Sequence, residues 1–239
     1  APDGSGNPKC DDRMVGCRML MKKKILILVC LLAVLLAGAD VGTVQVNAAV
    51  RNRITGTKRK GYVYVDRAGT VVKAGEIRQA VDFVLKNSSR KNKTRQRLRQ
   101  CYDALVKFSY FHMGTEVPTA RNIKSCARYM FTRKRGSCYY YAAAMAYIAR
   151  VLGYDSRVAV GGVTARGPYA QLSPHGWCEV RIGSRWLICD CSMQRAHSDQ
   201  NLFLVSEIRY PFRMRRDKTY VMTVKKGRVI WKQLLPAFR

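Results

Sequence analysis

Cys138 is the residue whose type and position point most directly to chemistry. It follows Gly136-Ser137 in "RKRGSCYYYAAAMAYIARVLGY", at the start of a stretch where apolar residues recur every three or four positions. That spacing predicts a helix with one buried face, capped by Ser137 at its start and by Gly153 at its end. The helix dipole and the basic run 133–135 favour a thiolate at the first helical position. A buried structural thiol is the alternative, because free cysteine is often buried.

A nucleophilic thiol needs a base, and His175 is the best placed of the three histidines. It opens "HGWCEVRIGSRWLICDCSM", which predicts two strands joined by a type II′ turn at Gly183-Ser184. Counting outward from that turn places Trp177 opposite Asp190, which makes His175 a diagonal neighbour of Asp190 at roughly 7 Å between backbones. The other two histidines have no such companion in the sequence. The hairpin therefore predicts an imidazole beside a carboxylate.

These three residues predict nucleophilic catalysis. Cys138 is the expected nucleophile, His175 the general base, and Asp190 the residue that orients the imidazole. Backbone amides at the helix start are the expected oxyanion donors, and the sequence identifies no upstream side chain for that role.

The same motifs, in this order, resemble the transglutaminase-like superfamily. The resemblance is carried by the Gly-x-Cys at a helix start, the basic strand "SRVAVGGV", the His-x-Trp strand with an acidic residue two positions further on, and the strand ending in Asp190. It covers roughly residues 104–193. It implies an α+β, papain-like fold, in which N-terminal helices accompany a nucleophile helix packed on an antiparallel sheet. It also implies that Cys138, His175 and Asp190 attack an amide through a thioester acyl-enzyme. The family often has proline after the aspartate, where this chain has Cys191.

A second motif offers an alternative family. "DCS", at 190–192, resembles the Asp-Cys-Ser of NlpC/P60 peptidoglycan endopeptidases, where a histidine follows on a later strand. The only histidine downstream is His197, which is too close to lie on a separate strand. The sequence therefore disfavours that alternative.

The expected function is an exported cysteine-dependent enzyme that cleaves or transfers the acyl group of a protein or peptide amide. Hydrolysis at the cell surface is favoured over transamidation, because water is always present and no feature specifies an amine acceptor. The alternative is a non-catalytic module that keeps the fold and binds polyanions or the cell wall. The sequence identifies neither the substrate nor the oligomeric state.

Residues 21–48 have the pattern of a secretory signal peptide, with three lysines, an apolar run and a Val-x-Ala ending. A membrane anchor formed by an uncleaved signal is the alternative. Residues 1–20 are interpreted as an upstream or mis-set start segment. Residues 49–100 are expected to form an N-terminal hairpin and a basic helical region, and residues 101–239 the catalytic domain.

The chain is strongly basic, with 44 Lys and Arg against 15 Asp and Glu and a net charge of +29. For an exported protein such charge favours anionic wall polymers or an anionic membrane surface as partners. No motif for specific nucleic-acid recognition accompanies the charge. The densest run, 86–100, predicts a loop leading into the basic face of a helix.

Six cysteines follow the signal: Cys101, Cys126, Cys138, Cys178, Cys189 and Cys191. Five remain beside the nucleophile and cannot all pair within one chain, so mostly free, buried thiols are expected. Cys178, Cys189, Cys191 and His197 lack the usual spacing of zinc ligands. Neither a metal nor a cofactor is expected.

The remaining elements serve as a scaffold. Helices are predicted at 75–87, about 94–111 and 122–131. Hairpins are predicted at 61–73 and at 219–232, the second with a turn at Lys226-Gly227.

Overall fold

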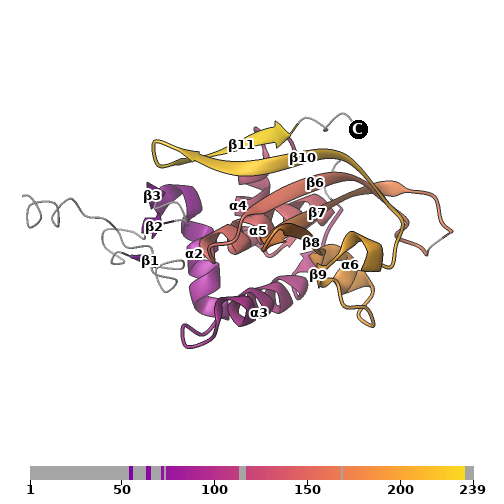
Figure 1. Ribbon diagram of the computed structural model, residues 1–239, viewed down its shortest axis with the longest axis horizontal. Helices are drawn as coiled ribbons and strands as arrows, with labels where there is room; N and C mark the ends of the chain where they lie inside the picture. Colours follow the sequence, from indigo (N-terminus) through magenta and orange to yellow (C-terminus); the bar gives the residue numbers. More distant parts are fainter. Residues whose placement is uncertain are drawn as a thin grey trace, which may run out of the picture. The chain divides into compact units, whose positions relative to one another are not determined.

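The computed structural model describes residues 54–55, 63–65, 71–72, 74–112, 117–167 and 169–234 (Figure 1). All of them belong to the second of two compact units, residues 1–45 and 46–239. The predicted start segment and signal peptide, 1–20 and 21–48, lie outside the described ranges. None of the helices within these ranges combines the length and the apolarity needed to cross a membrane.

A six-stranded antiparallel sheet forms the centre of this unit, in the order β11-β10-β6-β7-β8-β9. Its strands are β6 (Ser156–Val163), β7 (Ser173–Ile182), β8 (Arg185–Cys189), β9 (Phe203–Val205), β10 (Met214–Lys225) and β11 (Arg228–Leu234). Consecutive strands β6, β7, β8 and β9 are neighbours, whereas β10 returns to pair with β6. The sheet contains two of the three predicted hairpins, the one with its turn at Gly183-Ser184 and the one at 219–232.

Five helices accompany the sheet: α2 (Ala74–Asn87), α3 (Thr94–Val106), α4 (Ile123–Arg133), α5 (Cys138–Val151) and α6 (Cys191–Ala196). A short 3-10 helix, η2 (Glu207–Arg209), precedes β10. Two small sheets complete the described elements. One is antiparallel and contains β1 (Ile54–Thr55), β2 (Val63–Val65) and β3 (Val71–Val72), and the other pairs β4 (Ser109–Tyr110) with β5 (Arg135–Gly136) in parallel. The predicted α+β fold, with the nucleophile helix on an antiparallel sheet, is confirmed.

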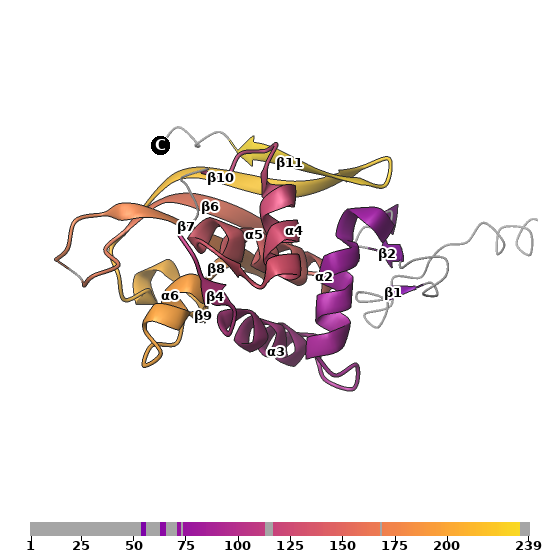
Figure 2. The same ribbon diagram turned by 180° about the vertical axis from the view of Figure 1, so that it is seen from behind.

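Helix α5 is buried almost all round, which differs from the single buried face that the sequence predicted. Twelve of its 14 residues are buried, because α2 and α4 pack against it on one side and β6 and β7 on the other. Figures 1 and 2 show α5 enclosed between these helices and the sheet. Its many alanines permit this close approach. Packing against the helices and against the sheet holds the first residue of α5, Cys138, in a fixed position.

The sequence predicted the C-terminal cap of α5 correctly but not the N-terminal side-chain cap. Ser137 is the N-cap, but its hydroxyl makes no capping hydrogen bond, so the expected side-chain cap is absent. Its carbonyl instead accepts from the amides of Tyr140 and Tyr141 at 3.0 and 3.2 Å. At the other end Gly153 has φ 83°, and the amide of Tyr154 bonds back to Ala149 at 2.9 Å. That pattern is a Schellman C-cap, which needs glycine at the left-handed position.

Helix α3 is shorter than predicted. It ends at Val106 rather than near 111, because residues 109–110 form β4 and pair in parallel with β5, directly before Cys138. The change of direction after Val106 brings Tyr110 toward the start of α5. Helix α3 also runs through the expected domain boundary at residue 100, so that boundary falls inside a helix.

The hairpin of β7 and β8 has the predicted register. Ile182 pairs with Arg185 and Cys178 with Cys189, and Gly183 has φ 62° while Ser184 has no positive φ, as a type II′ turn requires. Cys178 and Val180 face the large core that contains α5, whereas Trp177 and Ile188 belong to a second apolar cluster. The alternation of side chains along the strands, on which the site prediction depended, is confirmed.

Candidate active site

His175 and Asp190 are in direct contact. The Nε2 atom of His175 lies 2.8 Å from Oδ2 of Asp190, and the two side chains are 7% and 1% exposed. The sequence predicted neighbours across the hairpin, and the structure brings them to hydrogen-bond distance. Because Nε2 is taken by the carboxylate, Nδ1 is the ring nitrogen left for another partner.

The carboxylate of Asp190 receives four hydrogen bonds. Oδ1 accepts from the amide of Met193 at 3.0 Å and from the hydroxyl of Ser192 at 3.1 Å, while Oδ2 accepts from His175 and from the hydroxyl of Tyr210 at 2.7 Å. Burial alone raises the pKa of Asp190, but the charge of His175 and these donors outweigh it and lower the pKa below its usual value. Asp190 is therefore held as a carboxylate although it is buried.

The pKa of His175 is shifted in the opposite direction. Burial by itself lowers it, but the charges of Asp190 and Cys138 and the hydrogen bonds to both raise the pKa to about 10. An imidazole between a carboxylate and a thiol is thus stabilised as the imidazolium.

Cys138 lies at the start of α5 and is 6% exposed. Its thiol interacts electrostatically with His175. Both residues line one cavity of about 700 Å³, together with Ser137, Tyr110, Tyr139 and Ser192. The structure thus assembles all three predicted site residues, from α5, β7 and the end of β8, beside a space large enough for a substrate.

Tyr110 is a site residue that the sequence analysis missed. It lines the same cavity as Cys138, and its pKa is raised by burial and then by the charge of Cys138. The phenol therefore stays protonated and can donate. The sequence placed residue 110 inside a helix, and only the parallel pairing of β4 with β5 brings it to the thiol.

Tyr139 is the tyrosine of α5 that lines this cavity. It packs against Gly176 of β7, where an added Cβ would lie 2.5 Å from the Tyr139 ring. The glycine directly after His175 therefore allows the start of α5 to approach the histidine strand closely.

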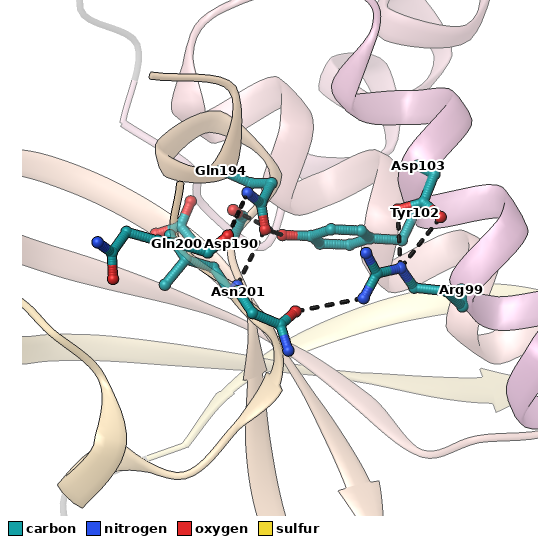
Figure 3. Close-up of polar contacts among 8 residues, drawn as sticks. Arg99, Tyr102, Asp103, Asp190, Gln194, Gln200 and Asn201 are labelled. Atoms are coloured by element: carbon teal, nitrogen blue, oxygen red, sulfur yellow. Dashed lines mark hydrogen bonds and ion pairs between the residues drawn. The ribbon is translucent and has the colours of Figure 1, made fainter. Parts of the chain in front are cut away.

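The segment after Asp190 is fixed by a polar network from helix α3 (Figure 3). The hydroxyl of Tyr102 donates to the Asp190 carbonyl at 3.2 Å and lies 3.3 Å from Oε1 of Gln194. Gln194 in turn accepts from the amide of Leu202 at 2.9 Å and donates to the carbonyl of Gln200 at 2.7 Å. Asp190 is also the N-cap of α6. These bonds fix the backbone that carries the carboxylate.

A second buried carboxylate, Glu179, lies two strand positions beyond Trp177. It is 1% exposed and accepts from Arg157, from Arg216 at 2.6 and 2.9 Å, and from the Trp177 indole at 2.9 Å. The Trp177 ring lies parallel to the His175 ring, with centroids 6.2 Å apart. Glu179 therefore supports the strand that carries the histidine without touching the cavity.

The remaining cysteines lie outside the cavity, whereas His112 lines it together with Cys138 and His175. All six described cysteines are free and buried, as expected, and burial raises the pKa of Cys101 to about 11 and of Cys189 to about 12. The ring of His197 bonds the carbonyl of Ala165 at 3.1 Å. No group of three potential metal ligands occurs among the residues that the structure describes.

Comparison with known proteins gives one family match. Residues 82–191 match the model of the transglutaminase-like superfamily, a segment that contains Cys138, His175 and Asp190. No curated protein matches the chain.

Three solved structures show weaker similarity. A TGase has 15% identity and a TM-score of 0.38, covering 49% of this chain and 31% of its own. A candidate cysteine protease from Cytophaga hutchinsonii has 14% identity and a TM-score of 0.38, and the match covers 69% of this chain and 55% of the protease. An arylamine N-acetyltransferase from Mycobacterium abscessus has 17% identity and a TM-score of 0.35, and the match covers 66% of this chain and 56% of the transferase. The chain thus spans from about a third to somewhat over half of their lengths, and the assignment rests on the family match.

Proposed function

Residues 82–191 belong to the transglutaminase-like superfamily, which supports a cysteine-dependent enzyme, and we propose that this chain attacks amides through a thioester on Cys138. The observation that carries the proposal is the contact of His175 with the buried carboxylate of Asp190, beside a thiol at a helix start. A structural cysteine has no need of an oriented imidazole.

The resting state in this proposal is a thiolate–imidazolium pair. The Asp190 carboxylate holds Nε2 of His175, so Nδ1 faces the thiol, and the raised pKa of the imidazole keeps its proton at neutral pH. Transfer of the thiol proton to His175 creates the nucleophile without any external base.

Acylation then follows from this pair. The thiolate adds to the amide carbonyl, and the developing oxyanion is stabilised by the backbone amide of Cys138 and by the protonated hydroxyl of Tyr110. His175 gives its proton to the leaving nitrogen as the C–N bond breaks. The products of this half-reaction are a free amine and a thioester.

Deacylation uses the same groups in reverse roles. His175 takes a proton from a nucleophile that attacks the thioester, and the thiolate leaves. With water the product is a carboxylic acid, and with an amine it is a new amide. Hydrolysis is the proposed outcome, because the described lining of the cavity offers no carboxylate that would bind an amine acceptor.

We place this activity at the cell surface, by export through the signal at 21–48. The net charge of +29 favours anionic wall polymers or an anionic membrane surface as the setting. Protein or peptide amides are the proposed substrates, because the thiol chemistry acts on amides. Separation of cells into secreted, wall and membrane fractions, with detection of the chain and its N-terminus, tests this part.

The first test of the chemistry is alkylation. The protein is treated with iodoacetamide from pH 4 to 9, and the modified cysteine is identified by mass spectrometry in the wild type and in His175→Ala. Selective labelling of Cys138 well below pH 8, slowed by the loss of His175, is the expected result. Labelling that is no faster than at Cys101 and Cys126 contradicts the proposal.

The charge also favours a second candidate, a non-catalytic polyanion-binding module. The exposed residues Lys91, Lys93 and Arg95, in and after the loop before α3, give this candidate a specific surface. Binding to an anionic polymer that survives Cys138→Ala and weakens steeply with salt supports it. The two candidates separate cleanly, because only the enzyme requires the thiol.

A further inference from the structure

We propose that Arg166 and Arg195 form a carboxylate-binding clamp in the cavity of Cys138, so that the acyl donor carries an acidic group close to the amide that is attacked. This proposal rests on the proposed function and narrows its substrate class. It concerns two residues to which the mechanism assigns no part.

The first observation is the charge of the cavity. Arg166, from the turn after β6, and Arg195, from α6, line the same space as Cys138 and His175. None of the described residues around this space is an aspartate or a glutamate. Two guanidinium groups without a nearby carboxylate create a positive potential where the substrate must enter.

The second observation is that both arginines lack an ion-pair partner. No carboxylate of the described residues lies within 4.0 Å of either one. Other arginines in the same unit are paired, such as Arg216 with Glu179 and Arg150 with Asp155. Both guanidinium groups beside the thiol are therefore available to an anionic ligand.

The third observation is that the two arginine-bearing segments are tied together. The ring of His197, directly after α6, bonds the carbonyl of Ala165, directly before Arg166, at 3.1 Å. That ring also packs on Phe212, with centroids 4.7 Å apart. Asp190 and Gln194 fix the rest of α6, as described above. The bond therefore keeps the two backbone segments that carry Arg166 and Arg195 at a fixed distance from each other.

A carboxylate is the ligand that this arrangement fits. Guanidinium groups present a planar fork of donors that matches two carboxylate oxygens, and charge-assisted bonds of this kind are stronger than neutral ones. The carboxylate belongs either to an acidic side chain of the donor or to a free chain end. Both sources share the same chemistry and differ only in position relative to the attacked amide.

The test compares two reagents that differ in charge and little in size, iodoacetate and iodoacetamide. The rate constant for alkylation of Cys138 is measured with each, and their ratio is compared among the wild type, Arg166→Gln, Arg195→Gln and the double variant. Because both reagents react with the same thiolate, any change in the ionisation of Cys138 cancels in the ratio. The expected ratio falls about five- to tenfold in the double variant, as expected for partly exposed charge pairs.

Arg185→Gln is the matched control. It removes the same charge from an exposed position at the hairpin turn, outside the cavity, and it is expected to leave the ratio unchanged. An equal fall in Arg185→Gln would show that the net charge of the protein acts without a clamp, and this overturns the proposal. An unchanged ratio in the double variant, with His175-dependent labelling intact, overturns the clamp and leaves the proposed function standing. Absence of selective labelling of Cys138 overturns both.

A second arm identifies the source of the carboxylate. N-acetylglutamine and N-acetylglutamic acid α-amide are isomers that carry the carboxylate at the chain end and on the side chain, respectively. Each is tested for slowing the iodoacetamide labelling of Cys138, against neutral N-acetylglutamine α-amide. Stronger protection by one isomer, lost in the double arginine variant, supports the clamp and names the source. Protection by neither isomer beyond the neutral amide contradicts it.

Discussion

The two buried carboxylates, Asp190 and Glu179, are satisfied by different kinds of partner. Both are 1% exposed and lie on the same face of the hairpin of β7 and β8. Glu179 is surrounded by two guanidinium groups and an indole, none of which gives up a proton at neutral pH. Asp190 is surrounded by an imidazole, two hydroxyls and a backbone amide.

In the proposed mechanism, this difference separates a carboxylate that stabilises the fold from a carboxylate that controls a proton. A carboxylate paired with permanent cations fixes strands and has no proton to exchange. A carboxylate paired with an imidazole sets the proton affinity of that imidazole, which faces the thiol. Burial alone therefore does not distinguish the two carboxylates, whereas the kind of partner does.

The largest expected effect comes from Asp190→Asn. Asparagine still caps α6 but presents a neutral amide to His175, so turnover on an amide substrate should fall about 10³- to 10⁴-fold, as for related triads. Labelling of Cys138 by iodoacetamide near pH 6 should slow in parallel. Unaltered labelling in a folded variant would mean that Asp190 is no more catalytic than Glu179.

Glu179→Gln should lower the stability of the fold and leave the reactivity of Cys138 nearly unchanged. It leaves two partly buried guanidinium groups with a neutral partner, and the free energy of unfolding should fall by about 3 kcal/mol. Chemical denaturation measures the loss. The labelling rate of the fraction that remains folded should change little, and a loss of labelling without destabilisation would place Glu179 with Asp190 instead.

The pH dependence of stability should distinguish the two carboxylates again. The raised pKa of His175, about 10 against an ordinary 6.5, contributes stability that is complete below about pH 6.5 and is lost as the pH rises toward 10. The lowered pKa of Asp190 contributes stability above its ordinary value of 3.8 and loses it as the pH falls. The difference in unfolding free energy between the wild type and His175→Gln should therefore shrink from pH 6.5 to 10.

The corresponding difference for Glu179→Gln should stay level over the same interval, because arginine keeps its charge. Denaturation series at several pH values provide both curves. Parallel curves for the two variants would remove the distinction drawn between the carboxylates.

The smallest expected effect is that of Tyr210→Phe. It deletes one of four donors to Asp190, so the labelling rate of Cys138 should fall by threefold to tenfold, equivalent to about 1 kcal/mol. Tyr220→Phe, a buried tyrosine of β10 in the other core cluster, is the matched control and should leave the rate unchanged. Equal rates in both variants would show that the other three donors suffice.

The sequence allowed much of the site to be predicted, because local rules govern it. Turn chemistry fixes the register of β7 and β8, and the register brings His175 to Asp190. The start of α5 follows from apolar periodicity and from glycine and serine at 136–137. The catalytic roles of the three residues remain predictions that the alkylation experiments address.

The parts that could not be predicted depend on contacts between distant segments. Tyr110 reaches Cys138 only because two-residue strands pair in parallel, a pattern with no sequence signature. Tyr210 reaches Asp190 from a segment 20 positions further on. Helix α6 was missed because its six residues are too few for a periodic pattern.

The bond between Tyr102 and the Asp190 carbonyl can form only after the whole candidate site has been synthesised. It joins residues 88 positions apart, and the intervening chain holds both the thiol and the imidazole. During synthesis Cys138 emerges first, then His175, and the carboxylate last. A nascent chain that ends before β8 thus carries a cysteine without its oriented base, and Tyr102 takes its final place only when the catalytic set is complete.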